Sequence, residues 1–233
     1  QILGMVINDI LLVPIWGIFF ARFPSVNGWE YLDTMQVLII STASFSIVHI
    51  LASGLNKLSE TITKGDLDYY LAFPQDVLWH SVVMGINLSA IGDLIFSIIL
   101  IVLYIPFTFA NLGLLAVAIT CSSAILFATL LIYHTVTFYV GKFEEAAAQG
   151  QEAILSTSMY PQTAFNGLLK ILIMTVIPAF FIDTIPQRLL SSFSWSDLCI
   201  LLSISIGLNI IAVLFFRLVL KRYESGNMFQ VRV

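Results

Sequence analysis

From Leu94 to Gly141 the chain contains no Asp, Glu, Lys or Arg, and this uncharged run constrains the fold more than any other feature. A run of about 18 or more apolar residues is long enough to cross the hydrocarbon core of a bilayer. This run is more than twice that length, and it is interrupted only around Pro106, Asn111 and Gly113, which are turn residues. The run therefore predicts two membrane spans joined by a tight hairpin.

Apolar stretches of about 17 to 25 residues recur along the chain, which is 59% hydrophobic and only 10% charged. We therefore expect an all-α, polytopic membrane protein with one transmembrane domain over residues 1–233. Because the chain begins inside an apolar run and without Met, we also expect residues to precede Gln1. The six predicted spans are 1–20, 35–55, 82–104, 112–140, 165–182 and 198–218.

The positions of the basic residues predict the orientation of these spans, because Lys and Arg are retained on the cytoplasmic side near span ends. In the loops after the first, third and fifth spans, the only Lys or Arg residues are Arg22 and Arg188. We therefore expect both termini in the cytoplasm. No run of basic residues suggests nucleic acid as a partner. The apolar spans make the lipid bilayer the expected environment. The opposite side has Lys57, Lys64, Lys142, Lys170, Arg217, Lys221, Arg222 and Arg232.

The cytoplasmic connection 56–76 is unusually polar for this chain, and it has features of two short helices. We expect the second span to continue as an amphipathic helix that Gly65 ends, and we expect Asp66 to cap the next helix. Pro74 disfavours helix at the residue before it. The second helix would present apolar side chains to water, either as an interfacial helix at the lipid headgroups or as a docking surface for a protein. These side chains are Leu67, Tyr69, Tyr70, Leu71 and Phe73.

Three motifs, in order along nearly the whole chain, decide between these alternatives. They are Ile62-Thr-Lys-Gly65-Asp66-Leu67-Asp68 followed by Leu71 and Pro74, then Tyr160-Pro161 leading to Ile177-Pro178 and Ile185-Pro186, and finally Leu220-Lys-Arg-Tyr223-Glu-Ser225. With these motifs the sequence resembles the permease subunits of bacterial type-2 ABC exporters with six spans. In that family the connection between spans two and three is a coupling helix that docks onto a separate ATPase.

The resemblance implies a function and a set of partners. The chain would move a substrate out of the cytoplasm, across the bacterial cytoplasmic membrane, together with a second permease subunit that is either a copy or a different chain. ATP and Mg would bind to the partner ATPase, so no cofactor is expected in this chain. The coupling residues implied are Gly65, Asp66, Leu67, Asp68, Tyr69, Tyr70, Leu71 and Pro74.

The resemblance also implies a re-entrant element between spans five and six, around Pro178 and Pro186. Two prolines eight residues apart oppose one unbroken helix, and irregular backbone at membrane depth survives only when it is buried in protein or faces a cavity. The alternative is an exposed loop in which Asp183 and Arg188 are solvated.

The chain has no motif of a hydrolase. Its Gly141-Lys142 pair is followed by Phe143 and is not part of a phosphate-binding loop. No G-x-S-x-G turn is present, and the three histidines have no partner at metal-ligand spacing. We therefore expect that the chain is not an enzyme.

Asp9 and Asp93 are the acids deepest in the predicted spans, where a charge costs about 2.5 to 3.5 kcal/mol even on insertion scales. Such residues either line a transport path or make hydrogen bonds between helices. They also define a rival function, an ion-coupled secondary transporter, and a membrane scaffold without transport is a further alternative. Spans rich in Phe, Ile and Leu favour a hydrophobic or amphipathic cargo.

The Ala-rich stretch 142–159 is predicted to be a helix on the cytoplasmic side, with Glu144, Glu145 and Glu152 on its surface. We expect a solvated extension of the fourth span, and a second contact with an ATPase is the alternative.

Overall fold

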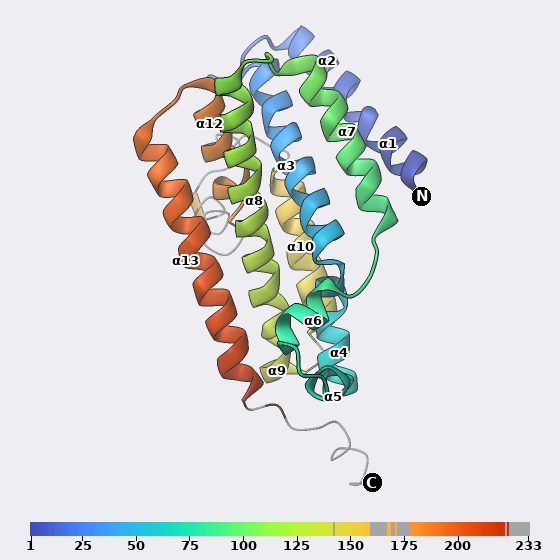
Figure 1. Ribbon diagram of the computed structural model, residues 1–233. Helices are drawn as coiled ribbons and strands as arrows, with labels where there is room; N and C mark the ends of the chain where they lie inside the picture. Colours follow the sequence, from blue (N-terminus) through green and yellow to red (C-terminus); the bar gives the residue numbers. More distant parts are fainter. Residues whose placement is uncertain (142, 159–166, 169–170, 172–177, 222, 224–233) are drawn as a thin grey trace.

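The computed structural model describes the chain except residues 142, 159–166, 169–170, 172–177, 222 and 224–233, and the described part is a bundle of long helices (Figure 1). The two central helices are α3 (Tyr31–Leu51) and α8 (Phe109–Thr135), which pack against each other. On one side α7 (Leu88–Tyr104) lies against α3, and on the other side α13 (Trp195–Leu220) lies against α8. Within the described residues no strand forms, so the predicted all-α class is confirmed.

Four described helices are long and apolar enough to cross a membrane, and this makes the chain a multi-pass membrane protein. A fifth candidate consists of α6 (Val77–Val83) and α7, which are bent by 76°. The predicted span 165–182 lies mostly outside the described residues, so the number of six spans stays a prediction. The four helices are Ile2–Arg22, which comprises α1 (Ile2–Ile10) and α2 (Leu12–Arg22), Tyr31–Leu51, Phe109–Val140, which includes α9 (Thr137–Val140), and Trp195–Leu220.

The segment predicted as one span over 82–104 is broken in the structure. α7 begins only at Leu88, because the Asn87 side chain accepts hydrogen bonds from the backbone N–H groups of Ser89 and Ala90. Such a cap satisfies amide groups that have no partner inside the helix, and it contributes about 1 kcal/mol. The prediction missed this break because the residues around Asn87 are themselves apolar.

The core of the bundle surrounds α3. Met35 and Ile39 of α3 and Phe96 of α7 are fully buried, as expected for side chains at the centre of a helix bundle. The outer helices instead expose large apolar side chains such as Leu3 of α1 and Leu218 of α13. Surfaces of this kind are stable against lipid or against another apolar protein surface, and costly in water.

Short helices occupy one end of the bundle (Figure 1). We expected the second span to reach residue 55 and to continue as an amphipathic helix, but α3 ends at Leu51 and Ala52 leaves the helical conformation (φ −130°, ψ 42°). The chain turns there because α6 packs against the 3₁₀ helix η1 that follows. The elements at this end are η1 (Ser53–Lys57), α4 (Leu58–Lys64), α5 (Leu67–Leu71), α6 and α9.

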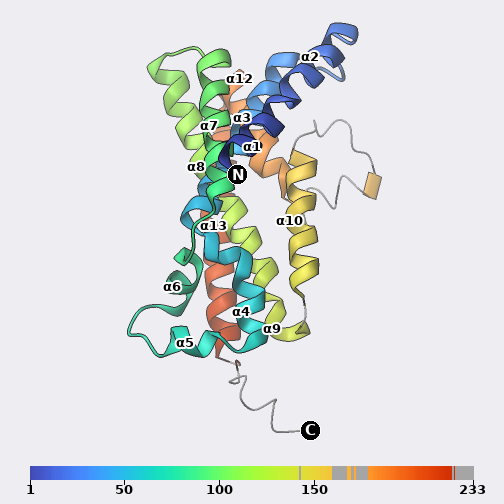
Figure 2. The ribbon, with the colours of Figure 1, turned by 90° about the vertical axis from the view of Figure 1, so that its right-hand side faces the viewer.

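α10 (Glu144–Ser158) corrects the prediction of a solvated extension of the fourth span. Instead of extending α8, it runs back beside the bundle and contacts α3 and α8 (Figure 2). Ile154 and Ser158 are fully buried, and the Ser41 hydroxyl of α3 donates to the carbonyl oxygen of Ser158 at 3.3 Å. α10 is therefore a part of the bundle, although its exposed face is polar.

Candidate functional site

The residues predicted to couple the chain to an ATPase lie at the end that carries α4, α5 and α6 (Figure 1). Gly65 ends α4 in a left-handed conformation (φ 79°), which other residues adopt only with strain. The prediction that Asp66 caps α5 is wrong, because its backbone is already helical and its side chain makes no cap hydrogen bond. Pro74 is exposed in the loop between α5 and α6.

Three apolar side chains of this element form an exposed surface, which we call the aromatic tip. They are Tyr69, Leu71 and Phe73, which are 55%, 46% and 40% exposed, and the rings of Tyr69 and Phe73 are 4.9 Å apart. Leu67 was also expected at this surface, but it is fully buried because it lies on the inner side of the single helical turn. Tyr70 is half-buried and packs against the core. Leu67 therefore anchors the element, and the aromatic tip faces away from the protein.

Contacts with the end of α13 hold this element in place. Arg217 Nη2 lies 3.0 Å from Asp76 Oδ2, at the start of α6. The ring of Phe138 packs edge-on against the ring of Tyr223, just after α13. Burial, followed by the nearby carboxylate of Asp68, raises the pKa of the Tyr223 hydroxyl to about 12. Asp76 thus connects the start of α6 to the end of α13, and Asp68 of α5 lies close to Tyr223.

A buried polar cluster connects α4 to α8 and α9. The Ser59 hydroxyl oxygen lies 2.8 Å from Nδ1 of His134 and 2.8 Å from the hydroxyl oxygen of Thr137. All three side chains are buried, and hydrogen bonds between buried polar groups fix how two elements sit against each other. The segment of α4, α5 and α6 therefore has a second attachment, to the central helix α8.

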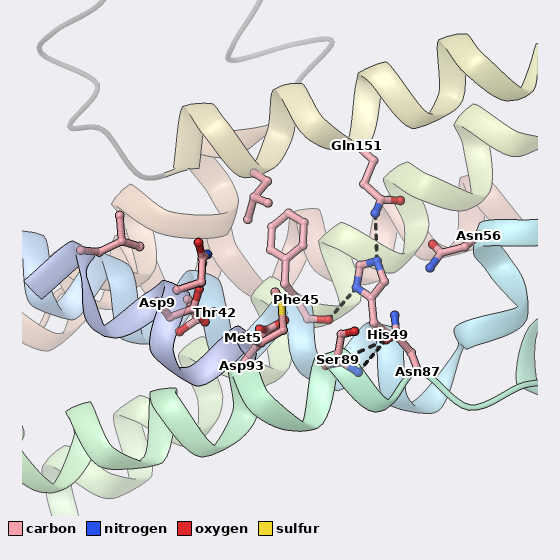
Figure 3. Close-up of a pocket in the computed structure, with 14 residues that line it drawn as sticks. Met5, Asp9, Thr42, Phe45, His49, Asn56, Asn87, Ser89, Asp93 and Gln151 are labelled. Carbon is pink, nitrogen blue, oxygen red and sulfur yellow. Dashed lines mark hydrogen bonds between the residues drawn. The ribbon is translucent and has the colours of Figure 1, made fainter. Parts of the chain in front are cut away.

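The second polar feature is a cavity of about 410 Å³ between α1, α3, α7 and α10 (Figure 3). It contains both acids that the sequence places in membrane spans, Asp9 and Asp93, at one end. His49 and Gln151 lie at the other end (Figure 3). The structure therefore brings the two acids into one site, which sequence spacing does not show.

The side chains of Asp9 and Asp93 lie near each other at one end of this cavity. Two carboxylates that lie close together repel, so a proton or a cationic partner stabilises such a pair. Gly92 makes this placement possible, since a Cβ at that position would lie 2.8 Å from the Cβ of Met5. The two acids are therefore brought together by close packing of α1 on α7.

His49 connects α3 to α10 at the other end of the cavity. Its Nδ1–H donates to the carbonyl oxygen of Phe45 at 2.8 Å, and the Gln151 amide donates to its Nε2 at 3.0 Å. Both ring nitrogens are therefore engaged, and His49 connects α3 to α10. Among the described residues, no three His, Cys, Asp or Glu side chains come together as a metal site requires.

Residues 4–226, nearly the whole chain, match the family described as ABC-2 family transporter protein. The chain belongs to this ABC-2 family. Its membership makes the chain a membrane subunit of an ABC transporter, which is not itself catalytic, and it implies an ABC ATPase as a partner. No curated protein and no solved structure matches the chain.

In this ABC-2 chain the segment predicted to be re-entrant is helical and buried. A π-helical turn, η3 (Phe180–Thr184), leads directly into α12 (Ile185–Ser191), and both pack against α3 and α8. The alternative of an exposed loop is wrong for Asp183, which is 1% exposed. Arg188 is half-exposed and is paired with Asp197 at 3.1 Å.

The two prolines of this segment occupy positions that a helix tolerates. Pro178 precedes the first helical residue, and Pro186 is in the first turn of α12. Pro186 has no N–H for the carbonyl group of Ile182, and the Ser122 hydroxyl of α8 donates to that carbonyl oxygen instead, at 2.7 Å. The freed backbone group is therefore satisfied inside the protein, as non-helical backbone in a membrane requires.

Sequence reasoning missed three of the residues that build these sites in the ABC-2 chain. Gln151 was overlooked because α10 was expected in solvent. Ser59 and Asp76 gave no signal, because their partners His134 and Arg217 are far away in the sequence. At Asn87 the sequence does carry a signal, because Asn is a residue type that begins helices, although the prediction of one span over 82–104 passed over it.

Proposed function

We propose that the chain is the membrane-spanning half of an ATP-driven exporter, and that the aromatic tip docks onto a separate ATPase subunit. The observation that carries this proposal is that Tyr69, Leu71 and Phe73 are exposed on an element fixed to α8 and α13. Exposed aromatic clusters are typical of residues that anchor protein interfaces. Membership of the ABC-2 family supports an ATPase, rather than lipid headgroups, as the occupant.

The attachments of α4, α5 and α6 suggest how ATP hydrolysis would move the membrane helices. The ATPase would bind ATP and Mg, and its closure would displace α5. The displacement would reach α13 through Asp76 and Arg217, and it would reach α8 through Ser59 and His134. Packed helices of this kind shift between discrete arrangements rather than deforming continuously, which is what alternating access needs.

The proposal includes the assembly and its location. A single chain of this kind is half of a transport path, so we propose a second permease subunit, either a copy or a different chain. The outer faces of α1 and α13 expose apolar side chains that fit a partner or lipid. We place the complex in a bacterial cytoplasmic membrane with both termini in the cytoplasm, and export as the direction of transport.

Co-purification with the ATPase encoded beside this gene tests the docking. We expect Tyr69→Asp and Leu71→Arg to weaken binding of the ATPase by tenfold or more and to abolish its stimulation, because hot-spot residues contribute about 2 kcal/mol or more. Leu67 is unsuitable for this test, since a charge at a fully buried position would disturb folding.

A matched control is Phe109→Asp at the opposite end of the bundle, where Phe109 is 100% exposed and begins α8. An acidic residue at a helix N-terminus is favourable, so folding should persist and the ATPase should still bind. If the tip variants retain the ATPase as well as the native chain does, the tip is an interfacial helix and the proposed docking is wrong.

The placement of Asp9 and Asp93 in one cavity is the observation that favours the rival function, an ion-coupled secondary transporter. Reconstituted vesicles separate the two functions. The exporter requires the ATPase and ATP for flux, whereas the rival would carry flux along an ion gradient with this chain alone and would lose it in Asp93→Asn.

A further inference from the structure

The cavity between α1, α3, α7 and α10 restricts the chemistry of a cargo. Its volume of about 410 Å³ lies within the range of about 300 to 1,000 Å³ that holds drug-sized ligands. Among the described residues that line it, the acidic ones are Asp9 and Asp93, and none is Lys or Arg. The cavity therefore attracts positive charge and disfavours an anionic ligand.

The acid pair has an unmet requirement for hydrogen-bond donors. Oδ1 of Asp93 is buried and receives no hydrogen bond from any described residue. Oδ1 of Asp9 receives only a long one, from the Asn8 amide at 3.3 Å. A buried carboxyl oxygen without a donor is unfavourable. A ligand that brings several N–H donors and a positive charge would satisfy both side chains.

The rest of the wall is apolar or neutral. Met5, Phe45 and Leu155 offer apolar surface beside the acid pair. At the far end, the ring nitrogens of His49 are already engaged by Phe45 and Gln151, so this end provides no free charge. The cavity thus combines one acidic end with an apolar body, which is complementary to an amphipathic molecule with a single cationic end.

We propose that the cavity binds the protonated amine of an amphipathic cargo between Asp9 and Asp93, with the apolar body of the cargo against Met5, Phe45 and Leu155. This inference rests on the transport function proposed above and adds the chemical class of the cargo. The shared chemistry is an ammonium group with N–H donors, which a soluble amine or the headgroup of an aminophospholipid can provide.

Fluorescence anisotropy of dansylcadaverine, a primary amine with an apolar fluorophore, tests the proposal. The full chain, together with its ATPase where the two co-purify, is placed in phosphatidylcholine nanodiscs, and empty discs give the background. We expect the amine to bind at least tenfold more tightly than its N-acetyl derivative, which has the same body without the charge. Equal binding of the two probes would overturn the proposal, and this comparison requires no variant to fold.

Variants locate the binding. Asp9→Asn and Asp93→Asn keep the size of the side chain, and each should weaken binding of the amine at least tenfold, or about 1.4 kcal/mol. Glu145→Gln is the matched control, because Glu145 is exposed on α10 and outside the cavity. If both Asn variants, shown by their melting curves to be folded, bind the amine as the native chain does, the site is elsewhere and the proposal is wrong.

A second lipid composition identifies the source of the ammonium group. Nanodiscs with phosphatidylethanolamine should reduce binding of dansylcadaverine if the natural ligand is a lipid headgroup, and should leave it unchanged if the ligand is a soluble amine. Either result is compatible with the site. None of these binding measurements requires ATP. Amine binding without docking of the ATPase would therefore overturn only the proposed exporter function. Docking without amine binding would overturn only the proposed class of cargo.

Discussion

At the scale of single residues, Gly92 determines how closely the first helix approaches α7. A Cβ at this position would lie 2.7 Å from the carbonyl oxygen of Ile2 and 2.8 Å from the Cβ of Met5. We expect Gly92→Ala to lower the free energy of unfolding by about 1 to 3 kcal/mol, because α1 has to move away from α7. Unfolding in mixed detergent micelles measures the change.

Gly17→Ala in α2 is the matched control, since a Cβ there has no neighbour within 4 Å. Ala is favoured over Gly in a helix by about 1 kcal/mol, so this variant should be as stable as the native chain or more so. A loss of stability of the same size in both variants would show that the contact at Gly92 is not what the substitution disturbs.

At the scale of elements, the ion pair between Asp76 and Arg217 connects α6 to α13. Both side chains are about half-exposed, so their coupling energy should not exceed about 1 kcal/mol. We expect Arg217→Gln to leave the melting temperature nearly unchanged and yet to reduce the ATP hydrolysis that the chain stimulates in its partner, because movement of α5 and α6 would no longer reach α13.

Asp76→Asn is the companion variant, because it removes the charge while Asn remains a good N-cap for α6. In a double-mutant cycle on ATP turnover, the double variant Asp76→Asn with Arg217→Gln should lose no more turnover than either single variant loses. Additive losses would mean that the two residues act independently and that the ion pair does not transmit motion.

The elements also show what the sequence could predict. The helix Trp195–Leu220 contains the predicted stretch 198–218, because length and apolar composition are sufficient to recognise a long span. The position of α10 was not predictable in this way, since a helix with an Ala-rich inner face and Glu on its outer face reads as solvated. The placement of Asp9 and Asp93 in one cavity and the ion pair of Asp76 with Arg217 depend on packing between distant segments, which the spacing of residues does not encode.

At the scale of the whole molecule, the two ends of the bundle should lie on opposite sides of the membrane. Among the described residues, Lys57, Lys64, Arg217 and Lys221 lie at the end that carries the aromatic tip, so we expect that end in the cytoplasm. In a background of Cys121→Ser and Cys199→Ser, we expect a membrane-impermeant maleimide to label Ser192→Cys in intact cells. Lys64→Cys should react only after the cells are opened.

The pair of labelling sites also tests the docking. Ser192 follows α12 at the far end of the bundle, and Lys64 ends α4 beside the aromatic tip, so both are exposed and neither lines the cavity. If Lys64→Cys reacts in intact cells, the tip is outside, no cytoplasmic ATPase can reach it, and both the orientation and the docking are wrong. If both variants react only after opening, the chain crosses the membrane an even number of times between residues 64 and 192, and the prediction of three spans there, 82–104, 112–140 and 165–182, is wrong.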